Sequence, residues 1–391
     1  MQHILTINGG SSSVKFALFE TTEEFNRLLS GKVERIGSAD TEMEITDHAT
    51  GKTEHQAVVA AEHASVIQPL ARFIEKKVDF GQIAAVVHRI VHGGIRYSEP
   101  ALITPDMLVY LEQISPYDPE HLPMEIAMIR TFTHYYPNLR QVACFDTAFH
   151  RDMPRIAKIL SIPRRYFDEG VQRYGFHGIS YSFLMDELER SAGKAEASGR
   201  VILAHLGNGA SMAVVLSEKS IDTSMAFTPT AGLVMGTRTG DIDPGLAAFL
   251  AHTEKMTPTQ FYKMANYQSG MLGVSGKSSD MQDLLKMEKD DPNAADAIAL
   301  FCYTARKFIG AYAAVLNGLD TLVFSGGIGE NSALIRARIC NGLDFLGLEL
   351  DPSQNEANAP LISTAVSRVS VRVIRTDEEL QMARSGRRVL Q

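Results

Sequence analysis

The sequence contains little cysteine and fewer basic than acidic residues, and each shortage excludes a class of protein. Its three cysteines, Cys144, Cys302 and Cys340, form no CxxC or cysteine–histidine spacing that would build a zinc site, and they favour a reducing, cytosolic compartment. Lysine and arginine number 38 against 46 acidic residues, which gives a net charge of -8 at pH 7. This balance argues against nucleic acid or an acidic membrane as a partner, because phosphate groups bind to a basic face.

Long apolar runs are also missing from the 391 residues. No stretch approaches the roughly 20 apolar residues of a membrane-spanning helix, and the first ten residues lack the basic-then-apolar pattern of a secretory signal. We therefore expect a soluble, cytoplasmic protein. The composition, with 45% hydrophobic and 21% charged residues, is close to the globular average, and the length predicts two or three domains.

Two familiar nucleotide-binding motifs are absent as well. The segment GMLGVSGKS resembles a P-loop, but five residues separate Gly270 from Gly276 where that motif requires four, and no buried strand precedes it. No GxGxxG sequence lies between a strand and a helix with an acidic residue at the expected distance. These absences argue against a P-loop NTPase and a Rossmann dehydrogenase.

The sequence does contain a repeated turn that is rich in glycine and serine. Apolar strands at Ile4–Ile7 and Val14–Phe19 flank the turn NGGSSS, and strands at Val201–Leu206 and Met212–Leu216 flank the turn GNGAS. Two such hairpins suggest a duplicated fold. A third glycine-rich segment, GGIGENS, follows the strand Leu322–Ser325, and we expect it to form a loop that leads into a helix.

The rest of the chain alternates helices with short buried strands. Ala60–Lys77 has a helical pattern, Ile83–His88 and Gln141–Phe145 have the pattern of strands, and the proline after Asp291 marks the first turn of another helix. This alternation predicts an α/β architecture with helices packed on mixed sheets. We place a domain boundary near residue 150.

Glycine-rich turns after strands allow backbone N–H groups to approach a phosphate, and neighbouring serine hydroxyls add donors. Each turn alone is equally consistent with an ordinary hairpin, but three of them in one α/β chain predict a nucleotide site. Lys15 follows the first turn and has two interpretations, a phosphate contact or a solvated lysine on a strand.

Several charged side chains stand among glycines, where small neighbours leave them accessible. Arg89 lies in HRIVHGG, His177 in YGFHG and Arg238 in MGTRTGD. A guanidinium can clamp a carboxylate or phosphate through two parallel hydrogen bonds, although a surface ion pair is the more frequent role of a lone arginine. Asp146 stands at the end of a strand, where α/β enzymes place catalytic groups, and Glu378 is either a metal ligand or part of a solvated acidic face.

Seven segments, in order along the whole chain, resemble the acetate kinase family. They are NGGSSSVK from Asn8, HRIVHGG from His88, FDTAFH from Phe145, YGFHG from Tyr174, HLGNGAS from His205, MGTRTGDIDPG from Met235 and GGIGENS from Gly326. The resemblance implies an α/β fold of two similar ribonuclease-H-like (actin and sugar-kinase) domains with an interdomain cleft. The first domain, residues 1–148 with 380–391, would bind substrate and phosphate, and residues 149–379 would bind the nucleotide. The resemblance also implies a cytoplasmic homodimer that moves the γ-phosphoryl group of ATP reversibly onto acetate.

The same resemblance assigns roles to individual residues. The metal, Mg²⁺ or Mn²⁺, would bind Asn8 and Glu378. The catalytic residues would be Asp146, His177 and Arg238. The carboxylate and the methyl group of the substrate would contact Arg89, Val91, Tyr117, Phe176 and Pro229. ATP would contact Lys15, Ser11, Ser13, His205, Leu206, Gly207, Asn208, Gly209, Asp280, Met281, Gln282, Gly327, Ile328, Gly329, Glu330 and Asn331.

Two positions depart from the family pattern. Where the family has a stretch resembling PLHNP, this chain has PYDPEHLP from Pro116, which alters one wall of the substrate pocket. Gln282 replaces an arginine that is common in the adenosine loop. A kinase for propionate or another short acid is therefore the alternative within this class. A non-catalytic, actin-like nucleotide-binding protein is the alternative outside it.

Overall fold

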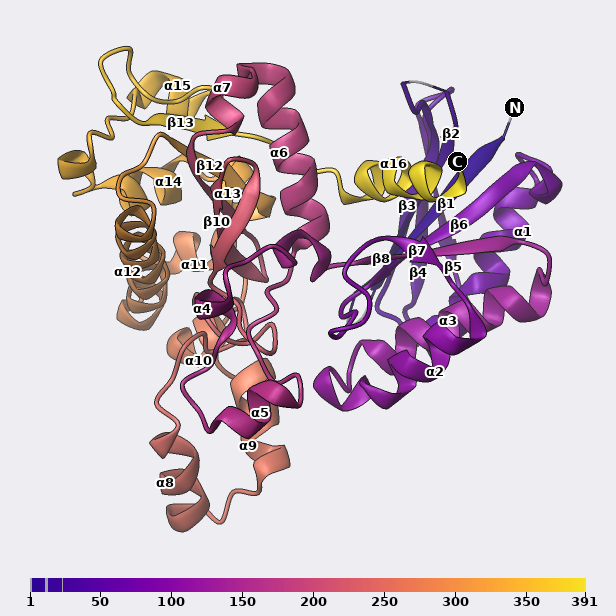
Figure 1. Cartoon of the computed structure of the whole chain (residues 1–391), viewed down its shortest axis with the longest axis horizontal. Coiled ribbons are helices and arrows are strands. Elements are labelled where there is room, and N and C mark those ends of the chain that lie inside the picture. Colours follow the sequence, from indigo (N-terminus) through magenta and orange to yellow (C-terminus); the bar gives the residue numbers. More distant parts are fainter. Residues whose placement is uncertain (1, 11–12, 23) are drawn as a thin grey trace. The chain divides into compact units, whose positions relative to one another are not determined.

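The computed structural model of the chain describes residues 2–10, 13–22 and 24–391. The chain divides into two compact units, Met1–Ala148 with Asp377–Gln391 and Phe149–Thr376 (Figure 1). The returning segment thus starts at Asp377 and not at 380, because the Asp377 side chain accepts the N–H of Leu380 and caps the helix that carries this segment. Glu378 consequently belongs to the first unit. Ser11, a predicted phosphate contact, lies outside the described residues.

The first unit is an eight-stranded sheet in the order β5-β4-β3-β2-β1-β6-β8-β7. Strands β1 to β5 pair antiparallel in sequence order, whereas β6 is parallel to β1 and β8 is parallel to β6. The strands are β1 (His3–Gly9), β2 (Ser13–Glu20), β3 (Arg27–Glu34), β4 (Glu42–Asp47), β5 (Lys52–Ala57), β6 (Ile83–Ile90), β7 (Ala101–Leu102) and β8 (Arg140–Phe145). The helices are α1 (Ile67–Glu75), α2 (Pro105–Gln113), α3 (Leu122–Tyr135) and α16 (Glu378–Leu390).

Helices cover both faces of the centre of this sheet. On one face, Leu5 of β1 belongs to a core that includes Ile67 of α1 and Phe132 of α3. On the other face, α16 contacts β1, β6 and β8, as the yellow helix in Figure 1 shows. It approaches β6 so closely that a Cβ at Gly386 would lie 2.4 Å from a methyl group of Val87. Packing of helices on both faces fixes the positions of the ends of β1, β6 and β8, where the charged residues of the candidate site lie.

The second unit repeats the central part of the first. Its sheet has the order β11-β10-β9-β12-β13, with β9 to β11 antiparallel and β12 and β13 parallel to β9, which is the arrangement of β3-β2-β1-β6-β8. The strands are β9 (Arg200–Leu206), β10 (Ala210–Leu216), β11 (Lys219–Thr223), β12 (Thr321–Ser325) and β13 (Ser370–Val373). The longer helices are α6 (Gly178–Ala192), α8 (Gly245–Thr253), α9 (Pro258–Tyr267), α12 (Pro292–Val315) and α14 (Ala333–Cys340). The shorter ones are α4 (Arg155–Lys158), α5 (Arg164–Asp168), α7 (Lys194–Ala197), α10 (Gly270–Ser275), α11 (Met281–Met287), α13 (Gly326–Asn331) and α15 (Pro352–Glu356).

Three expectations about elements need correction. The glycines of GGIGENS form no loop, because they build α13 directly after β12, where the Glu330 carboxylate accepts the Gly326 N–H at 2.9 Å. In the segment 60–77 the helix α1 begins only at Ile67, after a 3-10 turn at His63–Val66. One described helix, α12, with 24 residues, is long and apolar enough to cross a membrane by length and composition, contrary to the expectation that no segment is. A core helix of a soluble protein has the same properties, and a row of buried residues along α12 packs within the unit.

Candidate active site

In the first unit, Arg89 near the end of β6 is held by Asp146, which follows β8. Arg89 Nε and Nη2 donate to Asp146 Oδ2 at 3.1 and 2.6 Å, and Nη1 donates to the Gly9 carbonyl at 2.9 Å. Among the described residues, these hydrogen bonds use three of the five N–H groups of the guanidinium, so two can be offered to an anion. Because the Asp146 carboxylate binds one edge of the Arg89 guanidinium, the direction of the remaining N–H donors is fixed before any ligand binds.

A buried carboxyl group, that of Glu125, lies beside the Arg89–Asp146 pair, and the sequence analysis did not predict it. Glu125, on α3, accepts the Val91 N–H at 3.0 Å and lies 4.0 Å from Arg89 Nη1. Burial raises the pKa of Glu125 to about 8, because the attraction of Arg89 and the hydrogen bond from Val91 offset only part of the cost of desolvation. An isolated glutamate in a helix gives no signal in the sequence, so only the fold reveals this position.

The first residues of α16 add two partly buried acids. Asn8 Nδ2 donates to Glu378 Oε2 at 2.9 Å and to Glu379 Oε1 at 3.3 Å. Burial, and after it the negative charge of Asp146, raises the pKa of Glu378. Burial and the charge of Glu378 raise the pKa of Glu379 in the same way. The two predicted metal ligands, Asn8 and Glu378, are therefore in direct contact.

This group of oxygen-bearing side chains fits a magnesium ion. Asn8, Asp146 and Glu378 offer hard oxygen donors, and a divalent cation would relieve the repulsion that raises the pKa of Glu378. In the part of the chain that the structure describes, no three His, Cys, Asp or Glu side chains converge as a metal-binding group. Magnesium does not need such a cage, since it usually keeps several waters and binds through one or two carboxylates plus phosphate oxygens.

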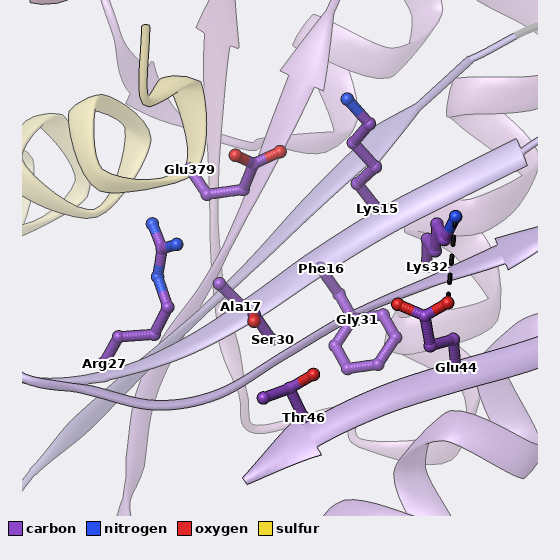
Figure 2. A pocket seen from close by; sticks show the side chains of 10 residues that line it. All are labelled: Lys15, Phe16, Ala17, Arg27, Ser30, Gly31, Lys32, Glu44, Thr46 and Glu379. Atoms are coloured by element: carbon purple, nitrogen blue, oxygen red, sulfur yellow. Dashed lines mark ion pairs between the residues drawn. The ribbon is translucent and has the colours of Figure 1, made fainter. Parts of the chain in front are cut away.

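Lys15 shares a hollow with Glu379 on the outer face of β2, β3 and β4. Figure 2 shows this hollow, of about 210 Å³, with the cations Lys15, Arg27 and Lys32 around it. Arg27 donates to both carboxylate oxygens of Asp377 at 2.6 and 2.7 Å, so it serves the cap of α16. The Lys15 ammonium lowers the pKa of Glu378 and Glu379, although burial raises it more. The Lys15 ammonium therefore lies near the carboxyl groups of Glu378 and Glu379 at the start of α16. Ser13, at the start of β2, accepts the Gly10 N–H with its backbone carbonyl at 2.8 Å.

The altered stretch after Pro116 contributes a buried hydrogen-bonded pair. His121 Nδ1 and Asp118 Oδ1 are 2.9 Å apart, and both side chains are buried. The Tyr117 ring stands edge-on to His92 with centroids 5.5 Å apart, and His92 follows the buried Val91 in the chain. Within the first unit, the altered stretch therefore packs against the loop that carries Val91, and the sequence analysis did not anticipate the His121–Asp118 pair.

In the second unit, His177 and Arg238 face one position beside Gly209. A Cβ at Gly209 would lie 3.5 Å from His177 Nε2 and 3.7 Å from Arg238 Nη1. His177 has a φ of 59°, a left-handed conformation that is uncommon for a residue with a side chain, and it caps α6. Its ring stacks on His205 with centroids 4.5 Å apart, while Arg238 Nη1 donates to the Pro229 carbonyl at 3.3 Å. Two of the predicted catalytic residues thus lie together.

The second unit also contains a cavity of about 650 Å³, a size typical of nucleotide and cofactor sites. Eight of the predicted ATP contacts line it: Gly207, Asn208, Asp280, Met281, Gln282, Gly327, Ile328 and Asn331. The lining also includes three residues that were not predicted: Ser279, Leu285 and Ser332. The Asp280 carboxylate accepts the backbone N–H of Gln282 at 2.7 Å and caps α11, so it shapes the wall of the cavity.

Other predicted ATP contacts lie behind this wall. Leu206 and Gly329 are buried. The Glu330 carboxylate faces inward, where it accepts the N–H groups of Gly326 at 2.9 Å and Thr376 at 3.1 Å. Leu206 of β9 and Gly329 of α13 lie where these two elements pack together, and none of the three residues lines the cavity. Phe176 is buried, and its carbonyl accepts a hydrogen bond from His150 Nε2 at 3.2 Å.

Comparisons with known proteins agree with one another. Residues 3–384 match the sequence profile of the acetokinase family. The chain is 41% identical to the acetate kinase of Methylocella silvestris, over 97% of this chain and 96% of that protein, and 41% identical to the propionate kinase of Escherichia fergusonii, over 100% and 97%. Its structure is similar to those of the Porphyromonas gingivalis acetate kinase (TM-score 0.91, 34% identity, 100% of both chains) and a Francisella tularensis propionate kinase (TM-score 0.93, 36% identity, 98% and 99%). The predicted fold class, two similar actin and sugar-kinase-like α/β domains, is confirmed.

Proposed function

Because the chain belongs to the acetokinase family, whose members are phosphotransferases with a carboxyl group as acceptor, we propose that it moves the γ-phosphoryl group of ATP reversibly onto acetate. The products are acetyl phosphate and ADP. The observation that carries the proposal is the Arg89 guanidinium, which Asp146 and the Gly9 carbonyl hold in place, and whose hydrogen bonds to described residues leave two N–H groups for an anion. This arrangement suits a small carboxylate better than it suits a neutral substrate.

The first unit contains the residues that would bind the acceptor and the metal. Arg89 binds the acetate carboxylate, and no strong base is needed because that carboxylate is already ionised at neutral pH. The barrier is then mainly the repulsion between two anions and the need to position them. Asn8 and Glu378, with Asp146 beside them, would hold Mg²⁺ or Mn²⁺, and such an ion neutralises charge on the transferring phosphoryl group when it is bound.

The second unit contains the cavity for the nucleotide and two hydrogen-bond donors, His177 and Arg238. ATP binds in the 650 Å³ cavity, where backbone N–H groups of the glycine-rich segments meet its phosphates. His177 and Arg238, which face the position beside Gly209, stabilise the oxygens of the transferring phosphoryl group. Asp146 acts by orienting Arg89, so it is a positioning residue of the reaction.

A hydroxamate assay for acyl phosphate, run on the purified chain with ATP, Mg²⁺ and acetate, propionate or butyrate, tests this function. We expect product with acetate at the highest kcat/KM. Propionate is the second candidate, because a propionate kinase and an acetate kinase are equally similar to the chain at 41% identity. A non-catalytic nucleotide-binding protein would give no acyl phosphate with any acid, and that result would overturn the proposal.

We further propose that the protein is a cytoplasmic homodimer with no nucleic-acid or membrane partner. Helix α8, with the sequence GLAAFLAHT, has no buried residue, and Phe249 on it is 60% exposed. An apolar helix of this kind is suited to cover a second copy of itself. Light scattering should give the mass of a dimer for the wild type and of a monomer for Phe249→Asp, and a monomeric wild type would refute the dimer. The cytoplasmic location draws support from the three cysteines, which are all buried and unpaired.

A further inference from the structure

A chain of hydrogen bonds inside the second unit ends at the His177 ring. The Tyr181 hydroxyl, on α6, is hydrogen-bonded to Ser211 Oγ, on β10. Ser211 Oγ in turn lies 2.9 Å from His177 Nδ1. Tyr181 and Ser211 are both completely buried. Water therefore does not reach either hydroxyl group, and their protons must be accommodated by these two contacts.

The number of protons decides which group donates in each of these two hydrogen bonds. Each of the two contacts holds one proton, and the hydroxyl groups of Tyr181 and Ser211 already supply two. Among the described residues, neither hydroxyl has another hydrogen-bond acceptor. A proton on His177 Nδ1 would be a third, and it would leave one buried O–H without an acceptor, which is unfavourable. The phenol therefore donates to Ser211, and Ser211 donates to His177 Nδ1.

We propose that Ser211, with Tyr181 behind it, holds His177 as the neutral imidazole that carries its proton on Nε2. This nitrogen is the one that faces the position beside Gly209 and Arg238. The Arg238 guanidinium, which faces the same position, also disfavours a positive charge on His177. Ser211 is thus a positioning residue.

The inference rests on the proposed function in one respect, the ligand of the Nε2–H group. In that reaction, Nε2–H is a preorganised donor to an oxygen of the transferring phosphoryl group, and Arg238 supplies the positive charge. A histidine without the constraint at Nδ1 would populate both tautomers, and only one of them can donate from Nε2. The chain of hydroxyls removes the wrong tautomer before the nucleotide binds.

Nitrogen-15 NMR of the ligand-free, full-length protein with labelled histidine tests the inference. His177 is assigned by the signal that disappears in His177→Gln. At pH 7 to 8 we expect a neutral ring with a protonated Nε2 and a bare Nδ1. A proton on Nδ1, or a charged ring, would overturn the proposal whatever the activity of the protein.

Two variants distinguish the effect of these hydroxyl groups on the His177 tautomer from an effect on packing alone. Ser211→Ala removes the donor to Nδ1, so we expect both tautomers to appear and kcat to fall by about five- to tenfold with little change in the KM for ATP. Tyr181→Phe is the matched control, because it removes a buried hydroxyl of the same chain but keeps the Ser211 donor, and we expect the Nε2–H tautomer to persist. An unchanged single tautomer in folded Ser211→Ala would show that Ser211 does not fix the ring.

The NMR and activity results can fail independently. If the tautomer is as expected and no acid is phosphorylated, the proposed function fails and the assignment of the proton stands. If acetyl phosphate forms and the proton is on Nδ1, the function stands and the inference about His177 fails.

Discussion

At the scale of residues, the two candidate arginines have different surroundings and therefore different expected roles. Arg89 is committed to a buried carboxylate, Asp146, and to the Gly9 carbonyl. Arg238 is near His177 and Gly209, and it donates to the Pro229 carbonyl, a neutral partner. Because Arg238 faces the position beside Gly209 together with His177, it is the better placed group for charge that develops during a reaction.

Arg238→Ala should accordingly lower kcat by about 100-fold or more and leave ATP affinity almost unchanged, because it removes stabilisation that exists mainly in the transition state. Steady-state kinetics and nucleotide titrations measure the two quantities. Arg165→Ala, an exposed arginine of the same unit, is the control and should behave like the wild type. A folded Arg238→Ala protein with normal kcat would remove Arg238 from the reaction.

Tyr117 belongs to the altered stretch and should affect the length of the acyl chain. Its ring is half-buried against His92, which follows Val91 in the chain, and extra volume there would disfavour a longer substrate. We expect a higher kcat/KM for acetate than for propionate, and Tyr117→Ala should narrow or reverse the ratio. A methylene group that fits is worth only ~1 to 3 kcal/mol, so the ratio is modest unless the ring excludes the longer acid. Equal ratios in wild type, Tyr117→Ala and the surface control Tyr135→Ala would show that Tyr117 does not contact the substrate.

Glu125→Gln should change how stability depends on pH. Burial raises the pKa of this carboxyl from 4.5 to about 8, so between these values the folded chain keeps a proton that the unfolded chain has released. The stability of the wild type relative to the variant is then highest below pH 4.5 and falls by on the order of 1 kcal/mol per pH unit up to pH 8. Urea unfolding at pH 5, 6, 7 and 8 measures the difference. A difference that does not vary with pH would place the pKa of Glu125 near its ordinary value.

At the scale of elements, the sequence predicts strands better than it predicts contacts. Short apolar runs bounded by glycine locate β1, β2, β9, β10 and β12 to within a few residues, because a buried strand needs such a run. The same rule misplaces α13, where consecutive glycines suggest a loop but the Glu330 carboxylate holds the Gly326 N–H and starts a helix. The Arg89–Asp146 and His121–Asp118 pairs could not be predicted, because they depend on which strands and helices are neighbours.

Helix α11 gives a prediction about the base of the nucleotide. Gln282 lies in its first turn on the cavity wall, and a neutral amide cannot stack and donate as a guanidinium does. We expect GTP or ITP to support turnover within about an order of magnitude of ATP, a difference of roughly 1.4 kcal/mol. Gln282→Arg should increase the preference for one nucleotide. Initial rates with the three nucleotides measure this, and strict ATP specificity of the wild type would be incompatible with loose recognition.

At the scale of the whole molecule, one sheet topology serves two chemical tasks. The first unit gathers an arginine, two buried carboxyl groups, Asp146 and Glu125, and two partly buried ones, Glu378 and Glu379, which suits a carboxylate and a divalent cation. The second unit offers a large cavity walled by glycines, with a histidine and an arginine near it. The division of charge between two copies of one fold explains how a single chain can bind two anionic substrates without a strongly basic composition.

The central claim, that Arg89 receives the carboxylate of the acceptor, is tested most directly by the KM for acetate of Arg89→Ala in the hydroxamate assay. With Mg²⁺ and ATP, the wild type should form acetyl phosphate, and the variant should show a KM for acetate raised at least about tenfold, with a smaller change in the KM for ATP. A variant in which only the KM for ATP moves, or a wild type that forms no acyl phosphate, would contradict the account.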